Sequence, residues 1–247
     1  MESEHILEID HLYKSFGSNK VLQDFSLVLH KGENLAVLGK SGSGKSVLIK
    51  CIVGLIEPDA GDISVFGKSI QEMDQEELDK ARARIGFLFQ SNALYDSMTV
   101  RENLEFPLRR HWIDKGEIDS EKAVTEALED VGLAHTIDMM PSELSGGMRK
   151  RIALARTLIL RPDIILYDEP TTGLDPITAR EISRLIVKVQ QKYNTSSLII
   201  SHDMNCIDNT SNHVIMLIDG RCYANETYDE LTKTDDPKIH EFFIESL

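Results

Sequence analysis

The amino-acid sequence predicts an α/β fold, in which a largely parallel sheet is covered by helices and divided by a helical insertion. Short, wholly apolar runs recur along the 247 residues, as expected for strands buried on both faces of a sheet. Segments with helical spacing alternate with these runs, and this alternation favours parallel strands joined by helices. A stretch over about 91–160 has only helical patterns and forms the predicted insertion.

The strands are expected at the apolar runs and at one alternating segment. Phe25, Leu27 and Leu29 alternate with less apolar residues, which is typical of a partly buried strand. A further strand is expected between Gly61 and Gly67. The remaining runs that predict strands are Leu35–Leu38, Ile63–Phe66, Ile164–Tyr167, Leu198–Ile200 and Val214–Leu217.

The helices are expected where apolar residues recur every three or four positions. One such helix ends at Gly132, a plausible C-terminal cap, and another follows the insertion between two predicted strands. The residues that define three helices are Ala123, Val124, Ala127, Leu128 and Val131; Ile152, Leu154, Ala155, Leu158 and Ile159; and Ala179, Ile182, Leu185, Ile186 and Val189.

The charge and the cysteine content of the chain exclude several classes of binding partner. Forty-one acidic residues against 27 basic ones give a net charge of −14, which argues against nucleic acid and against direct adsorption to an anionic membrane. Three cysteines are too few for a disulfide framework and suit a reducing compartment. Neither a signal peptide nor a long apolar run is evident, so any action at a membrane requires another subunit.

Residues 39–46 match the phosphate-binding loop G-x-x-x-x-G-K-[ST] in full. A predicted strand precedes the loop and an apolar-faced helix follows it, as nucleotide binding requires. Lys45 is expected to reach the β- and γ-phosphates, and the Ser46 hydroxyl to ligate Mg²⁺. The predicted binding residues of the loop are Gly39, Lys40, Ser41, Gly42, Ser43, Gly44, Lys45 and Ser46.

Asp168 and Glu169 follow the apolar run Ile164–Tyr167, at the strand end where ligands bind in open α/β sheets. Asp168 is expected to hold Mg²⁺ through water, and Glu169 to act as the general base for an attacking water. A pair of carboxylates that caps the next helix would also explain the pattern. Downstream of a phosphate loop we favour the catalytic interpretation.

Ser145, Gly146 and Gly147 stand at the predicted start of a helix and form a second candidate anion site, this time without a lysine. Ser145 could simply cap its helix. A chain that already has a phosphate loop does not need a second site for its own nucleotide. One explanation is that these residues serve the nucleotide of a neighbouring copy.

With these motifs in order, the sequence resembles the ATP-binding subunits of ABC transporters over essentially its whole length. Leu144–Met148 is similar to the signature motif, Gln90 to the Q-loop glutamine and His202 to the switch histidine; Asp175 lies in the D-loop, and Phe16 matches the aromatic that stacks on adenine. The resemblance implies ATP as substrate, hydrolysis by Glu169 with His202, and Mg²⁺ held by Ser46, Gln90 and, through water, Asp168.

The resemblance also implies a single ABC ATPase domain over 1–247. It would consist of a P-loop NTPase (RecA-like) core with an N-terminal antiparallel β subdomain, about 1–90 and 161–247, and a helical subdomain, about 91–160. Two copies would form a homodimer, with Ser145, Gly146 and Gly147 contacting the partner's ATP. Lys40 inside the phosphate loop is unusual for the family, and its role stays open, as does that of 224–247.

Within the family, segment 89–109 and Met140–Glu143 are similar to cassettes that power phospholipid transport with Mce-type subunits, the Mla-like systems. This similarity implies two partners, a transmembrane permease that docks on the helical subdomain and an Mce-type lipid-binding subunit. It also implies that the chain is a peripheral protein on the cytoplasmic face of the inner membrane. Amino-acid importers share part of the pattern, and a soluble ATPase of iron–sulfur cluster assembly is a further alternative. The docking surface is expected at apolar residues of 91–112, although some of them are expected to fill the core of the helical insertion instead. These residues are Ala93, Leu94, Met98, Val100, Leu104, Phe106 and Leu108.

Overall fold

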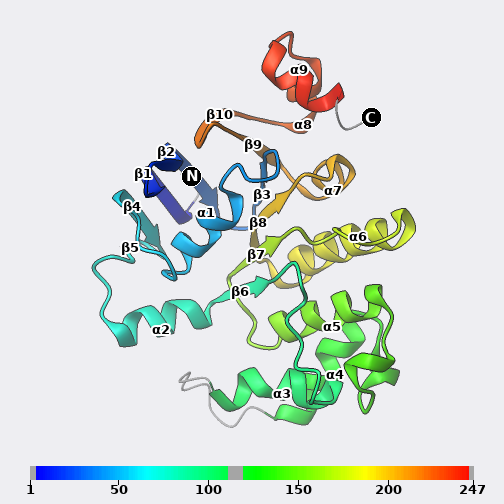
Figure 1. Ribbon diagram of the computed structural model, residues 1–247. Helices are drawn as coiled ribbons and strands as arrows, with labels where there is room; N and C mark the ends of the chain where they lie inside the picture. Colours follow the sequence, from blue (N-terminus) through cyan, green and yellow to red (C-terminus); the bar gives the residue numbers. More distant parts are fainter. Residues whose placement is uncertain (1–3, 111–118, 245–247) are drawn as a thin grey trace.

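A six-stranded sheet forms the centre of the molecule in this computed structural model, which describes residues 4–110 and 119–244 (Figure 1). The strand order is β10-β9-β3-β8-β7-β6, and every neighbouring pair except β9 and β10 is parallel. The strands are β3 (Asn34–Leu38), β6 (Ile85–Leu88), β7 (Ile164–Asp168), β8 (Ser196–Ser201), β9 (His213–Ile218) and β10 (Arg221–Glu226). The parallel runs predicted from the sequence are therefore confirmed.

A second, antiparallel sheet is built from the N-terminal part of the chain, in the order β2-β1-β4-β5. The backbone amide of Gln23 donates to the carbonyl of Gly220 at 2.8 Å and joins the two sheets. The strand predicted over Ile63–Phe66 ends one residue earlier, because Phe66 turns to φ 54°. The strands are β1 (His5–Phe16), β2 (Asn19–His30), β4 (Ala60–Val65) and β5 (Lys68–Ser69).

Helices cover both faces of the six-stranded sheet. Along β7, Ile164 and Leu166 pack into a core shared with α1 and the antiparallel sheet, whereas Ile165 and Tyr167 pack against α5 and α6. This alternation follows from the two-residue period of a strand. The helices are α1 (Lys45–Ile52), α2 (Gln75–Ala83), α3 (Val100–Arg110), α4 (Ser120–Asp130), α5 (Gly146–Leu158), α6 (Pro176–Tyr193), α7 (Met204–Thr210), α8 (Tyr228–Lys233) and α9 (Pro237–Ile244).

Helices α3, α4 and α5 gather at one end of the molecule and share a core of their own (Figure 1). Short 3₁₀ turns, η1 (Ala134–Thr136) and η2 (Pro141–Glu143), lead into α5. Val100 and Leu104 are 0% exposed, so these two of the predicted docking residues fill the core of the helical part and do not belong to a docking surface. Helical spacing marks an apolar stripe, and here α4 and α5 cover it.

The rest of the predicted docking surface is only partly available. Leu94 and Leu108 are half-buried against the helical core, and Met98 and Phe106 are also half-buried. Ala93 is exposed, and Tyr95 is 42% exposed. Positions 111 and 112 of the predicted segment lie outside the described residues. Across residues 4–110 and 119–244, no helix has both the length and the apolar character needed to cross a membrane.

Candidate functional site

The phosphate loop joins the end of β3 to the start of α1, and its glycines are required sterically. A Cβ on Gly39 would lie 2.5 Å from the Ser43 hydroxyl and 2.9 Å from the carbonyl of Leu217. Gly44 has φ 105°, and a Cβ there would approach Val21 to 2.8 Å. Only glycine fits these positions, so the backbone can fold tightly back toward the start of α1.

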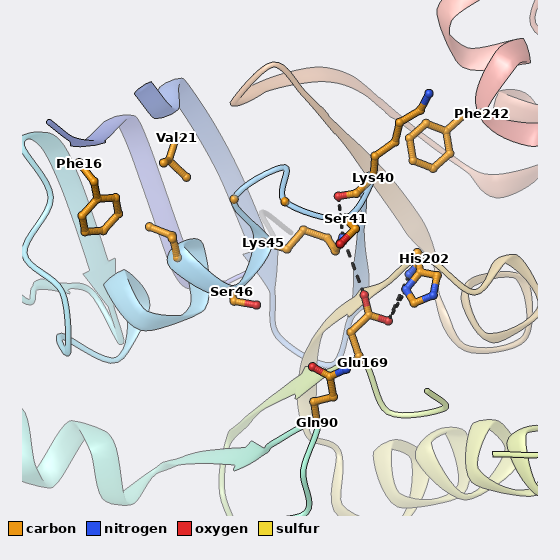
Figure 2. A pocket seen from close by; sticks show the side chains of 13 residues that line it. Phe16, Val21, Lys40, Ser41, Lys45, Ser46, Gln90, Glu169, His202 and Phe242 are labelled. Carbon is orange, nitrogen blue, oxygen red and sulfur yellow. Dashed lines mark hydrogen bonds and ion pairs between the residues drawn. The ribbon is translucent and has the colours of Figure 1, made fainter. Parts of the chain in front are cut away.

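The loop forms one wall of a pocket of about 600 Å³ (Figure 2). Two of the predicted loop residues, Gly39 and Ser43, are not part of this wall, and Ser43 instead lines an adjoining pocket of about 500 Å³. Predicted site residues from five separate segments meet here. They are Phe16, Lys40, Ser41, Gly42, Gly44, Lys45, Ser46, Gln90, Glu169 and His202.

Lys45 is buried at the base of the pocket. Its ammonium donates to the carbonyls of Gly39, at 2.5 Å, and Lys40, at 3.1 Å, and lies 3.8 Å from Glu169 Oε1. Burial lowers the pKa of Lys45, while the charges of Glu169 and Asp168 oppose this shift. The cation is thus fixed within the loop, with two carboxylates nearby.

Glu169 connects this lysine to His202. Its side chain is buried, and Oε2 lies 2.8 Å from His202 Nδ1 and accepts from the Thr172 hydroxyl at 3.1 Å. The Glu169 amide donates to the carbonyl of Ile200 in β8, and the residue has φ 49°. A left-handed backbone at a non-glycine residue stores strain and is typical of functional sites.

Asp168 is the last residue of β7, and one oxygen of its carboxylate accepts no hydrogen bond from the described residues. This oxygen, Oδ1, is buried. Burial, followed by the charge of Glu169, raises the pKa of Asp168, and Lys45 and Lys150 oppose the shift. An orphaned carboxylate oxygen, the Ser46 hydroxyl and the Gln90 amide are oxygen ligands of the kind that Mg²⁺ prefers, so these residues fit the ion.

Phe16 lies at the end of β1 and leaves half of its surface, 50%, exposed. The ammonium of Lys14 is 5.5 Å from the centre of its ring. Asp59 holds this end of the strand, because its carboxylate accepts from Lys14 and from the backbone amide of Ser15. An exposed ring on a fixed strand end is suited to stacking on a flat ligand.

The predicted second anion site lies at the start of α5, away from this pocket. Ser145 is exposed, and its hydroxyl accepts from the amide of Met148 at 3.2 Å, so it does cap its helix. A Cβ on Gly147 would lie 2.5 Å from Thr178 Cγ2. Neither Gly146 nor its two neighbours line the phosphate-loop pocket in the described part of the chain.

Asp175 lies at the start of α6, close to the start of α5. Its carboxylate accepts from the amides of Ile177 and Thr178, at 3.0 and 3.1 Å, and so caps α6. The residue is exposed. Asp175 and Ser145 therefore stand near each other on the surface, outside the pocket that contains Lys45 and Glu169.

Sequence reasoning missed Phe242, which lines the pocket together with Val21 and Val47, and it missed Lys150, which contacts the pocket residue Gln90 from α5. Phe242 of α9 lies beside Lys40 and lines the pocket, although the pair Phe242-Phe243 gave no indication of where it packs (Figure 2). Lys150 of α5 is only 2% exposed and donates to the carbonyl of Gln90 at 2.9 Å. Burial lowers the pKa of Lys150 to about 8, opposed by the charge of Asp168. Because Lys150 lies between Arg149 and Arg151, the sequence alone gave no signal of its burial.

Comparisons with known proteins agree with this geometry. A model of the ABC transporter family matches residues 22–172. The dimeric structure of MJ0796, a bacterial ABC transporter cassette, has a TM-score of 0.80 and 29% identity, over 90% of this chain and 98% of that one. The predicted P-loop NTPase core, with its antiparallel β part and helical part, is therefore confirmed.

Three curated relatives name different cargoes. The probable ribonucleotide transport ATP-binding protein mkl of Mycobacterium tuberculosis is 39% identical over 96% of this chain, which spans 66% of its length. The intermembrane phospholipid transport system ATP-binding protein MlaF of Haemophilus influenzae is 35% identical, over 97% of this chain and 90% of its own. The methionine import ATP-binding protein MetN of Campylobacter jejuni is 36% identical over 98% and 76%. The chain belongs to the ABC transporter family, as one of its ATP-hydrolysing cassettes.

Proposed function

We propose that this chain hydrolyses ATP as a homodimer to energise phospholipid transport between the inner and outer membranes. It acts at the cytoplasmic face of the inner membrane, with a transmembrane permease and an Mce-type lipid-binding subunit. The observation that carries the phospholipid assignment is the similarity to the Haemophilus MlaF, because it extends over 97% of this chain and 90% of that protein.

ATP binding is assigned to the pocket of Figure 2. Phe16 stacks on the adenine, and the backbone amides of the phosphate loop, with the positive end of α1, hold the phosphates. Lys45 contacts the β- and γ-phosphates, which is supported by its burial at the base of the loop. Ser46, Gln90 and, through water, Asp168 would hold Mg²⁺, which would neutralise charge on the phosphates.

Hydrolysis is assigned to Glu169. Its carboxylate takes a proton from water as the water oxygen attacks the γ-phosphorus, and the bond to the bridging oxygen breaks to give ADP and phosphate. His202, 2.8 Å from Glu169 Oε2, fixes the orientation of this base and contacts the γ-phosphate. The strained backbone at Glu169 supports the assignment, since packing must hold it in place.

Each site is completed by the partner copy. Ser145, Gly146 and Gly147 bind the partner's ATP, and Asp175 fixes the adjoining loop. Two observations support this. Ser145, Gly146 and Asp175 are exposed and Gly147 is half-buried, all of them outside the chain's own pocket, and a similar cassette, MJ0796, is described as dimeric. Lys40 lies at the same rim as Phe242, and we assign it to the wall of the pocket.

The permease docks on the helical part, next to the segment that follows Gln90. Exposed Ala93 and Tyr95 supply contact surface there. Because Gln90 lies between the pocket and this segment, changes at the phosphates can reach the permease through it.

A second candidate cargo, methionine, is favoured by the 36% identity to MetN. To separate the two, we would isolate the chain with its membrane complex and reconstitute it in phospholipid vesicles. We expect co-purified phospholipid and ATP-dependent phospholipid transfer to acceptor vesicles, with Glu169→Gln inactive. Stimulation of hydrolysis by methionine instead would replace the phospholipid assignment. Recovery of the wild type with soluble partners only would favour the iron–sulfur cluster alternative.

A further inference from the structure

Helix α5 belongs to two cores at once. Ile152 and Ala155 pack among α3 and α4, whereas Leu154 and Leu158 pack against the six-stranded sheet and α6. The helix begins with the exposed Ser145 cap and rises about 1.5 Å per residue. Any displacement at its start is therefore carried along a packed, stiff element into the centre of the molecule.

Two cations on α5 hold the backbone of the segment that contains Gln90. The ammonium of Lys150 donates to the carbonyl of Gln90 at 2.9 Å. One turn and a half further on, the guanidinium of Arg156 donates to the carbonyls of Ala93, at 2.9 Å, and Asn92, at 3.4 Å. Asn92 and Ala93 have φ 65° and 52°, which alanine rarely adopts. The segment thus keeps a strained shape that α5 supports.

Folding stability alone does not explain a lysine at position 150. Its side chain is 2% exposed, and within residues 4–110 and 119–244 its hydrogen bond goes to a neutral carbonyl, not to a carboxylate. Burying an ammonium in this way costs free energy, and the charge of Asp168 offsets only part of that cost. The free-energy cost of burying Lys150 beside Gln90 is consistent with a role of this lysine in the ATP site.

We propose that Lys150 is a positioning residue that ties the backbone of Gln90 to α5. A contact between the partner's ATP and Ser145, at the start of α5, then sets the position of Gln90 in the chain's own site. The two ATP sites of a dimer are coupled through these helices. Arg156 holds the backbone of the segment after Gln90 in a fixed position relative to α5. This inference rests on the proposed homodimer.

The test compares Lys150→Met with Lys122→Met, the same change at an exposed lysine of α4. Hydrolysis is measured against ATP concentration, and ATP binding and thermal unfolding are measured in parallel. For Lys150→Met we expect kcat to fall about 10–100-fold with ATP affinity within about twofold, since a hydrogen bond to a charged donor is lost. The Hill coefficient should fall from above 1 to 1. Lys150→Arg, which keeps the charged donor, should retain most of the wild-type kcat and most of the wild-type Hill coefficient.

Normal kcat in Lys150→Met, or an unchanged Hill coefficient, would overturn the inference. The same applies if Lys122→Met loses as much activity, or if the wild type itself has a Hill coefficient of 1. If Lys150→Met does not fold, Lys150→Leu, which also lacks a donor for the Gln90 carbonyl, takes its place with the same expected loss of coupling. Failure of the wild type to hydrolyse ATP or to dimerise would refute the proposed function instead, whatever Lys150 does.

Discussion

The starts of α1 and α5 are two helix N-termini that follow glycine-rich segments, and they differ in what surrounds them. At α1, buried Lys45 lies in a pocket with Glu169 and His202. At α5, Ser145 is exposed and bonded to its own helix. The first brings most of its predicted phosphate-binding residues together with the predicted base within one chain. For the second, we propose that the nucleotide of a neighbouring copy supplies the anion.

The difference follows from the residue just before each helix. Gly44 offers no side chain to the amides of α1, and its φ of 105° leaves no room for one beside Val21. Those amides depend on an external anion. Ser145 instead satisfies one amide of α5 itself, so that helix is stable without a ligand. Four substitutions, ordered by expected effect, sharpen this comparison.

The largest effect is expected at the phosphate-loop pocket. Glu169→Gln should slow ATP hydrolysis by about 10²–10⁴-fold, because the amide cannot accept the proton of the attacking water. ATP affinity should stay near that of the wild type. Steady-state hydrolysis and equilibrium binding of a fluorescent ATP analogue measure the two effects. Near-normal turnover would remove Glu169 from the role of base.

Lys45→Ala should weaken binding itself. Charge-assisted hydrogen bonds contribute about 1.5–3 kcal/mol, so ATP affinity should fall about 10–100-fold. The thermal shift that ATP gives the wild type should be reduced accordingly. A full thermal shift in this variant would show that the lysine does not contact the phosphates. Lys50→Ala, an exposed lysine of α1, serves as the control.

A steric test separates neighbouring glycines at the start of α5. Gly147→Ala places its Cβ 2.5 Å from Thr178 Cγ2 and should destabilise the free chain by about 1–3 kcal/mol. Gly146→Ala meets nothing closer than Leu174 at 4.0 Å and should be neutral. Urea unfolding without nucleotide measures both. Equal stabilities would mean that α5 and α6 are less closely packed than described.

The smallest effect is expected near Phe16. The hydrogen bond from Lys14, and then that from the Ser15 amide, lowers the pKa of Asp59 below 3.8. The carboxylate therefore stabilises the fold above this pH, and its contribution is lost as the pH falls through the lowered folded value. Asp59→Asn should lower Tm slightly at pH 7, and the deficit should shrink below pH 3.8 and vanish only below the lowered folded pKa, where the wild-type carboxyl is also protonated. Asp96→Asn, at an exposed position, is the control. A deficit for Asp59→Asn that does not shrink as the pH falls would contradict the assignment.

Most residues predicted for the phosphate site meet at one pocket, and the sequence could indicate them because the pattern is local. Eight consecutive residues form the loop, and Asp168 and Glu169 end a strand that is apolar throughout. The antiparallel sense of the N-terminal sheet came from family resemblance. Its strand order was not predicted, since alternation within one strand does not specify its neighbours.

What the sequence could not predict are contacts that depend on packing between distant segments. Phe242 reaches the pocket from α9. The sequence Phe242-Phe243 would be the same whether these rings packed in the core or bound a partner, so their place could not be predicted. Val100 and Leu104 have the spacing of a surface stripe, yet α4 and α5 cover them. The bond from Lys150 to Gln90 joins segments 60 residues apart.

The division of the site between two copies is tested most directly by light scattering of Glu169→Gln with ATP. The variant should form a dimer of twice 27.8 kDa with ATP and stay monomeric with ADP. Adding Ser145→Asp keeps a good helix cap but sets a negative charge against the partner's phosphates, whereas Ser145→Asn keeps the cap without the charge. We predict that Ser145→Asp abolishes the ATP-dependent dimer while each monomer still binds ATP, and that Ser145→Asn largely retains it. A dimer that survives Ser145→Asp, or one that forms equally without ATP, would contradict a site shared between two copies.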